Sequence, residues 1–176
     1  MNYATIKKFD VANGVGVRVS LFVSGCTHHC KGCFNEEAWD FNYGEAFTDV
    51  QKQEIIIALA PKHIKGFSLL GGEPFEPENR AVLCDLLQTI KATYPEKNVW
   101  CYSGYLYDSY MKNGKHADPQ NVQGMLDCID ILVDGKFVEE LKDINLLFKG
   151  SSNQRIIDVK ASEKANAVIL WENDNK

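Results

Sequence analysis

VRVSLFVSGCTHHCKGC, residues 17–33, carries the strongest structural signal in the chain. Its first half, Val17 to Ser24, is short, apolar and rich in β-branched residues, which is typical of a strand buried on both faces. Gly25 then opens a loop that contains Cys26, Cys30 and Cys33. The sequence therefore predicts a buried strand whose end carries three cysteines.

Alternating helix and strand patterns follow this stretch. A capping box of Thr48 and Gln51 begins a helix that runs through the apolar group 55–59 and stops near Pro61. Strands are predicted in GFSLLGGEP (66–74), NVWCYSG (98–104) and CIDILVDG (128–135), and helices over 78–94, through 106–110 and over 121–126. The alternation predicts an α/β fold with a mainly parallel sheet, either open or closed into an incomplete barrel.

Polar residues and glycines gather where these strands end. The cysteines follow the first predicted strand, Gly71 to Glu73 the second, Ser103 and Gly104 the third, and Asp134 the fourth. Folds of this class place their ligands at the C-terminal ends of the strands. We therefore expect these residues to share one pocket.

Length and composition narrow the classes of function. The chain has 176 residues, which fits a single domain over residues 1–176, and 45% hydrophobic with 24% charged residues is an ordinary globular composition. A net charge of -5 and a pI near 5.4 give no basic field for nucleic acid. Neither a signal-peptide pattern nor a run of about 18 apolar residues occurs, so we expect a cytoplasmic protein with no nucleic-acid or membrane partner.

The cysteines divide into two groups. Cys84, Cys101 and Cys128 stand in apolar segments, and we expect them to pack in the core. The three clustered thiols can hold a [4Fe–4S] cluster with one open iron, because such clusters normally take four protein ligands. An open position indicates catalysis, whereas a zinc site completed by a histidine indicates a structural module. The candidates for that fourth zinc ligand are His28, His29, His63 and His116, and spacing alone leaves both alternatives open.

The two motifs together resemble a known superfamily. Cys26-x3-Cys30-x2-Cys33, followed by GGEP at 71–74, resembles the motif pair of the radical S-adenosylmethionine enzymes. NGVGVRVSLFVSGC (13–26) is similar to the glycyl-radical enzyme activases, and GCFN (32–35), WCYSGY (100–105), ILVDGKF (131–137) and GSSNQR (150–155) are similar to the activases of anaerobic ribonucleotide reductase. The resemblance covers residues 10–158, and 159–176 form an unassigned tail.

Two positions depart from the superfamily pattern. Gly32 stands where most of the superfamily has an aromatic residue, although glycine, cysteine and an aromatic, here Phe34, are usual in the reductase activases. Val15 stands where related activases have proline. Neither change removes a cluster ligand.

The resemblance implies both a fold and a reaction. The fold would be an incomplete (β/α) barrel of the radical S-adenosylmethionine type. Cys26, Cys30 and Cys33 would hold a [4Fe–4S] cluster whose fourth iron chelates S-adenosylmethionine. Reductive cleavage would give a 5′-deoxyadenosyl radical that takes hydrogen from a glycine of the anaerobic (class III) ribonucleotide reductase. The chain would thus be an oxidoreductase that generates a glycyl radical.

The resemblance also implies residues around S-adenosylmethionine. The implied neighbours of S-adenosylmethionine are Gly32, Cys33, Phe34, Gly71, Gly72, Glu73, Ser103, Asp134 and Lys136, with no catalytic residue beyond the ligands. Glu73 would stand near the ammonium group, and Gly32 and Phe34 beside the adenine or ribose. A structural turn is the alternative for Ser103 with Gly104, and a hairpin turn for Asp134 with Lys136.

The implied partners are the reductase and a one-electron donor such as flavodoxin or ferredoxin, and a homodimer is an open expectation. Two other functions remain in view: an activase of a pyruvate formate-lyase type enzyme, and a non-catalytic zinc-binding interaction module.

Overall fold

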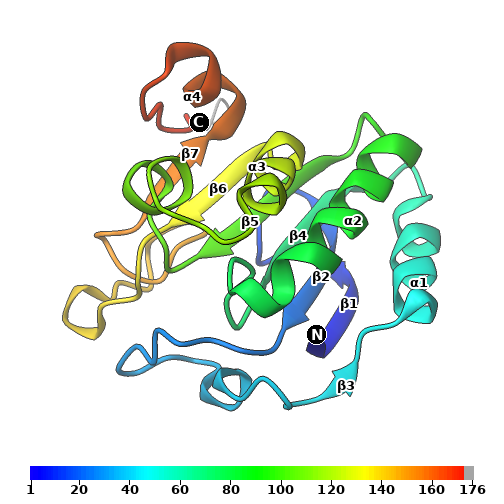
Figure 1. Ribbon diagram of the computed structural model, residues 1–176, viewed down its shortest axis with the longest axis horizontal. Coiled ribbons are helices and arrows are strands. Elements are labelled where there is room, and N and C mark those ends of the chain that lie inside the picture. Colours follow the sequence, from blue (N-terminus) through cyan, green and yellow to red (C-terminus); the bar gives the residue numbers. More distant parts are fainter. Residues whose placement is uncertain (173–176) are drawn as a thin grey trace.

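A computed structural model describes residues 1–172, and within this part seven strands form one sheet in the order β3-β1-β2-β4-β5-β6-β7 (Figure 1). The strands are β1 (Asn2–Asp10), β2 (Val17–Val23), β3 (Glu45–Ala46), β4 (Ile64–Gly71), β5 (Asn98–Ser103), β6 (Ile131–Asp134) and β7 (Arg155–Asp158). The helices are α1 (Asp49–Leu59), α2 (Pro77–Thr93), α3 (Pro119–Cys128) and α4 (Val159–Ala165), with short helical turns η1 (Glu36–Trp39), η2 (Tyr107–Lys112) and η3 (Glu139–Leu141).

The central strands are parallel and finish at the same edge of the sheet. β2, β4, β5 and β6 run in one direction, whereas β1, β3 and β7 are antiparallel to their neighbours. Val23 pairs with Gly71, and Ser103 pairs with Asp134, so the last residues of these strands are in register. The predicted α/β class with a mainly parallel centre is confirmed, and the sheet stays open between β3 and β7.

Helices α1, α2 and α3 cover one face of the sheet (Figure 1). The main core lies between them and the strands: Leu83, Leu87 and Ile90 of α2 are fully buried together with Phe67 and Leu69 of β4. Burying each such side chain contributes about 1.5–3 kcal/mol. The parallel strands are therefore fixed in position by the helices on this face.

The opposite face is covered by the segments that precede β2 and follow β6. Trp100 of β5 and Val133 of β6 are buried there, with Phe148 and Trp171 packed against them. The ring centroids of Trp100 and Trp171 lie 5.2 Å apart, and the two rings are arranged edge to face. These aromatic residues form a second, smaller core next to the cavity described below, and Phe148 lines that cavity.

Most predicted helices form close to their predicted bounds. Thr48 caps α1, because its Oγ1 accepts a hydrogen bond from Val50 N at 3.2 Å while Gln51 Oε1 accepts from Thr48 N at 3.0 Å. The segment through 106–110 differs from the expected helix. There Leu106 O accepts from both Tyr110 N and Met111 N at 3.1 Å, which widens the turn into the π-helix η2.

Besides the short β3, η1 and η3, three elements lie where the sequence predicts none. β1 pairs with β2, but most of its side chains are half-buried or exposed, so it lacks an apolar pattern. β7 pairs with β6, and α4 follows it with Asp158 as its cap. Much of the unassigned tail therefore belongs to the fold, since Val159 is fully buried and Leu170 forms an isolated antiparallel β-bridge with Ile157. The part of the tail at 173–176 lies outside the described residues.

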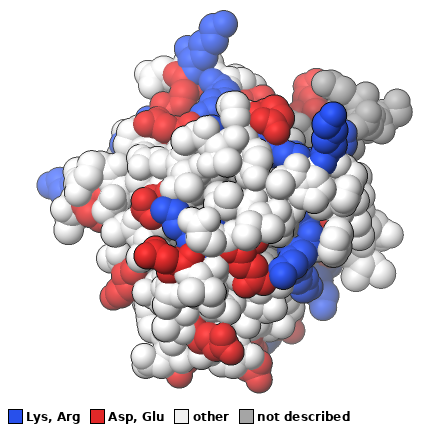
Figure 2. Space-filling view, turned by 90° about the vertical axis from the view of Figure 1, so that its right-hand side faces the viewer, with Lys and Arg blue, Asp and Glu red and all other residues white. Residues whose placement is uncertain are grey.

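None of the helices in residues 1–172 has the length and apolar composition needed to cross a membrane. On the α1 side of the molecule, acidic and basic side chains are interspersed rather than gathered into one field of a single sign (Figure 2).

Candidate active site

A cavity of about 440 Å³ opens at the C-terminal ends of the parallel strands. Most of the residues expected to share a pocket line it: Cys26, Cys30, Gly32, Cys33, Phe34, Gly71, Gly72, Glu73, Ser103 and Gly104. Its volume falls within the usual range for a small-molecule site. The expectation of a shared pocket is therefore met for these residues, which come from three strand ends.

The three cysteines lie in a loop whose two ends are fixed. Gly25 N donates to Ala38 O at 2.9 Å and Cys26 N to Trp39 O at 3.2 Å, so η1 closes the loop after β2. All three thiols are free, with Cys26 buried and the other two half-buried. Inside the loop, Cys33 N donates to Cys30 O at 3.1 Å. The loop thus presents three thiols to one cavity.

The thiol environment fits an iron–sulfur cluster better than isolated thiolates. Burial raises the pKa of Cys26 to about 11, and burial also raises the pKa of Cys30. Free thiolates are unfavourable at such positions, whereas a bound metal centre deprotonates its thiol ligands outright. Soft thiolate donors select iron–sulfur clusters or zinc. The donor set therefore fits a cluster held by three cysteines.

Each of the four histidines contacts a residue other than a cysteine, and His28 lines the same cavity as the cysteines. His28 Nε2 contacts Glu73 Oε2 at 3.0 Å, and the His29 ring stacks on Trp39. The His63 ring stacks on Phe9, and His116 Nε2 contacts Tyr110 O at 2.8 Å. Among residues 1–172, no three His, Cys, Asp or Glu side chains are close enough together to hold a single metal ion.

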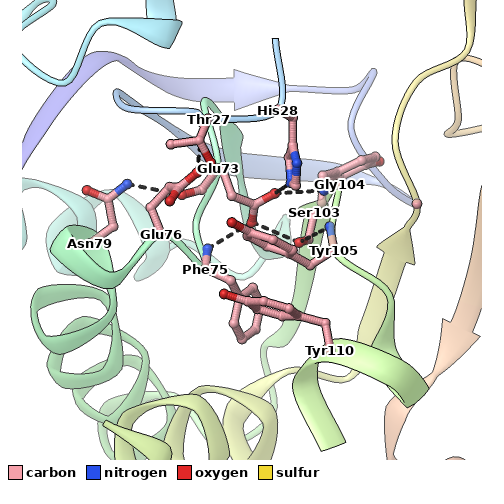
Figure 3. A network of polar contacts seen from close by, with 12 residues as sticks. Thr27, His28, Glu73, Phe75, Glu76, Asn79, Ser103, Gly104, Tyr105 and Tyr110 are labelled. Carbon is pink, nitrogen blue, oxygen red and sulfur yellow. Dashed lines mark hydrogen bonds and ion pairs between the residues drawn. The ribbon is translucent and has the colours of Figure 1, made fainter. Parts of the chain in front are cut away.

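Glu73 is the centre of a buried polar network (Figure 3). Its Oε1 accepts from Phe75 N and from Ser103 Oγ, both at 2.8 Å. Its Oε2 accepts from Gly104 N at 2.7 Å and contacts His28 Nε2 at 3.0 Å. The side chain is 1% exposed, so these four partners replace water. One carboxylate thereby joins the end of β4, the end of β5 and the cysteine loop.

The GGEP turn and the start of the cysteine loop form one structural unit. Gly72 N donates to Val23 O at 2.7 Å, and Glu73 N donates to Gly25 O at 2.8 Å. Glu76 Oε1 accepts from both Thr27 N at 2.8 Å and Thr27 Oγ1 at 2.6 Å. Two motifs about 45 residues apart in sequence are thus bonded directly to each other.

Close approach of backbone explains the two glycines of this turn. Gly71 has a φ of 114°, and a Cβ there would lie 2.6 Å from Val23 N. A Cβ on Gly72 would lie 2.5 Å from Gly25 O. A side chain at Gly71 would push β4 away from the end of β2, and one at Gly72 would push it away from the start of the cysteine loop. Gly71 and Gly72 are therefore needed for the loop's position, whatever they contact in the cavity.

Asp134 and Lys136 are placed differently from the other predicted site residues, because neither lines the cavity. Asp134 is fully buried, and its carboxylate accepts from Arg155 Nε at 2.9 Å and from Tyr107 N at 2.8 Å. Lys136 is exposed. The neighbouring Gly135 lines the cavity instead.

Part of the cavity wall comes from residues that no motif predicts. Ala12 and Asn13 precede β2, Tyr102 lies on β5, and His28, Trp39 and Leu70 also line the cavity, while the loop 137–154 supplies most of the others. From that loop come Phe137, Lys142, Leu146, Phe148, Lys149, Gly150 and Gln154. One available signal is GSSNQR (150–155), the segment that is similar to the reductase activases. Gly150 and Gln154 of this segment line the cavity, whereas Ser151, Ser152, Asn153 and Arg155 do not.

Comparison with known proteins assigns the chain to a family. Residues 12–157 match the family described as 4Fe-4S single cluster domain. The anaerobic ribonucleoside-triphosphate reductase-activating protein of Haemophilus influenzae is 43% identical over 158 residues, which cover 89% of this chain and 97% of the relative.

Two further relatives carry the same name. The protein of Escherichia coli K12 is 43% identical over 156 residues, with 88% of this chain and 96% of the relative covered. The protein of Enterobacteria phage T4 is 38% identical over 156 residues, with 89% and 93% covered. The chain therefore belongs to the family of anaerobic ribonucleoside-triphosphate reductase-activating proteins, within the 4Fe-4S single cluster domain family.

Proposed function

We propose that this protein activates the anaerobic (class III) ribonucleotide reductase by making a glycyl radical on it. The observation that carries the proposal is the cavity in which Cys26, Cys30 and Cys33 meet the GGEP turn at the ends of parallel strands. Its relatives are named as activating proteins of that reductase. The protein would be an oxidoreductase of the radical S-adenosylmethionine class.

Cys26, Cys30 and Cys33 would hold the [4Fe–4S] cluster, and the cavity has room for a ligand beside them. When bound, the cluster would supply one electron for the reductive cleavage of S-adenosylmethionine to methionine and a 5′-deoxyadenosyl radical, which would take a hydrogen atom from the reductase glycine and leave 5′-deoxyadenosine and a glycyl radical. A flavodoxin or ferredoxin would supply the electron.

The protein's own residues would bind S-adenosylmethionine, orient it and shield it from solvent. Gly71, Gly72 and Ser103 line the cavity and would border the methionine end of S-adenosylmethionine. Glu73 would place its negative charge near the ammonium group, while its Oε2 contacts His28 of the cysteine loop and accepts a hydrogen bond from Gly104 N at the end of β5. Gly32 and Phe34 would border the adenine or ribose. Asp134 and Lys136 do not line the cavity, so they would affect the cofactor only by positioning Gly135, which lies between them and does line it.

We also propose that residues 1–176 form one cytoplasmic domain and that the open sheet is an incomplete barrel. β2, β4, β5 and β6 are parallel, and their shared end opens into the cavity. An open mouth suits a substrate that is a loop of another protein. A homodimer remains part of the proposal, without a surface assigned to it.

Anaerobic reconstitution tests the proposal. The protein is loaded with iron and sulfide under argon, reduced with dithionite and given S-adenosylmethionine, and 5′-deoxyadenosine is measured by chromatography. We expect cleavage, and a glycyl signal in electron paramagnetic resonance once the reductase is added. Zinc without iron after anaerobic purification would instead support the zinc module. Cleavage with a glycyl signal on a pyruvate formate-lyase type enzyme, and none on the reductase, would favour the other activase.

A further inference from the structure

The loop 137–154 projects from the same end of the sheet as the cysteine loop (Figure 1). Its inner side chains, among them Lys142, Leu146 and Phe148, line the cavity. Its outer side chains do not. The loop therefore has a cavity side and a solvent side.

An ion pair and a close packing contact join this loop to the cysteine loop. Lys31 Nζ lies 2.9 Å from Glu139 Oε2 and 3.8 Å from Glu140 Oε1. A Cβ on Gly32 would lie 2.9 Å from Glu139 Oε1, so the glycine lets η3 approach the cysteine loop. An exposed ion pair alone stabilises little. The two loops nevertheless form one continuous edge at the mouth of the cavity.

Large apolar side chains stand exposed on the two loops that meet here. Phe34 of the cysteine loop is 83% exposed, and Ile144, Leu147 and Leu141 of the second loop are 89%, 64% and 43% exposed. We call these four residues the apolar rim. Single exposed apolar residues are ordinary, but a group beside a functional cavity is typical of an interaction surface.

Three lysines accompany the apolar rim. Lys142 and Lys149 line the cavity and Lys136 stands just before the loop, and none of the three forms an ion pair with a carboxylate among residues 1–172. A surface that combines apolar side chains with unpaired lysines is complementary to a polypeptide carrying apolar and acidic side chains.

The position of the rim decides between two kinds of polypeptide. A second copy of this chain seated on the rim would cover the cavity mouth and exclude a macromolecular substrate. The polypeptide substrate itself must reach this mouth, because its backbone has to enter the cavity. The continuity of rim and cavity therefore favours the substrate as the occupant.

We propose that the apolar rim is the surface on which the polypeptide substrate docks, with acidic residues of the substrate facing Lys136 and Lys142. The inference rests on the proposed function and adds the surface and the chemistry of the partner's docking segment. Docking on the rim would hold the substrate's glycine segment over the cavity.

The test compares two double variants of the reconstituted protein. Ile144→Ser with Leu147→Ser changes the rim, and Val50→Ser with Ile57→Ser changes two α1 residues that are 70% and 71% exposed. Binding to the anaerobic ribonucleotide reductase of the same organism is measured by biolayer interferometry without S-adenosylmethionine. Cleavage of S-adenosylmethionine by dithionite is measured separately, without reductase.

We expect the rim variant to bind the reductase at least about tenfold more weakly and to cleave S-adenosylmethionine as the wild type does. The α1 variant should match the wild type in both measurements. Wild-type binding by the rim variant, or equal weakening in both variants, would overturn the inference while leaving the proposed function intact. Failure of the wild type to cleave S-adenosylmethionine would contradict the proposed chemistry. Failure of the wild type to bind the reductase would contradict the proposed docking surface.

Discussion

Glu73 accepts hydrogen bonds from Phe75 N, Ser103 Oγ and Gly104 N and contacts His28, so its oxygens face donors. Glu73→Gln keeps the shape but turns a donating amide toward at least one of these donors. Leaving a buried donor unpaired costs roughly 1–3 kcal/mol. We expect a loss of this size in the free energy of urea unfolding of the metal-free protein.

The control for Glu73→Gln is Glu78→Gln, because Glu78 is exposed in the first turn of α2. Its effect should stay within about 0.5 kcal/mol. Equal stabilities for the two variants would mean that the Glu73 network does not hold the strand ends together.

The division of the cysteines is a second prediction for single residues. Cys26→Ala, Cys30→Ala or Cys33→Ala should each lose the cluster after reconstitution, as measured by iron and sulfide content, because each removes one of three ligands. Cys84→Ala should keep it, since Cys84 is buried under α3, where Gly124 lies against its sulfur. Equal iron loss in all four variants would contradict the assignment.

Among the elements, η2 and β7 are tied together by Arg155. Its guanidinium donates to Asp108 Oδ2 at 3.2 Å and also holds Asp134 of β6. The hydrogen bond from Arg155 lowers the pKa of Asp108 below its usual value near 3.8. Because the folded-state pKa is depressed, the stabilisation is complete above the unfolded pKa and is lost as the pH falls through the folded one.

We therefore predict that Asp108→Asn lowers the stability of the metal-free protein at pH 7, and that this difference shrinks as the pH falls from about 5 to below 4. Urea unfolding of both proteins across this range measures it. A difference that stayed constant with pH would show that the carboxylate charge does not stabilise the contact.

The elements differ in how well the sequence predicts them. β2, β4, β5 and β6 are buried parallel strands, so their apolar runs and the glycines at their ends reveal them. β1 is largely exposed and gives no such pattern. The turn η2 departs from an α-helix because Leu106 O is shared by two donors, which no spacing of apolar residues encodes.

The candidate site shows the same division. Motif residues at strand ends, such as Gly72 and Ser103, reach the cavity as predicted, because parallel strands bring their ends to one edge. Asp134 follows the same rule in sequence, but Arg155 draws its carboxylate into the fold. The sequence does not predict that the loop 137–154 forms part of the cavity wall, because the position of this loop depends on its tertiary contacts with the cysteine loop.

For the whole molecule, the two faces of the sheet depend on different parts of the chain. The helix face has a continuous core that includes Leu21, Leu69 and Leu132 from separate strands. The other face depends on the tail, because Trp171 packs on Trp100 and Phe148, and Phe148 also lines the cavity. The end of the described chain thus supports the wall of the candidate site.

Trp171→Ala should therefore destabilise the protein and loosen the cavity together. Trp171 is half-buried, and removing its contacts with Trp100 and Phe148 should cost roughly 2–3 kcal/mol in urea unfolding. Leu170→Ala, at a side chain 57% exposed on the same segment, should cost less than about 0.5 kcal/mol. Since Phe148 loses its support, the KM for S-adenosylmethionine should rise in Trp171→Ala alone. An unchanged KM with the full loss of stability would mean that the tail closes the fold without shaping the site.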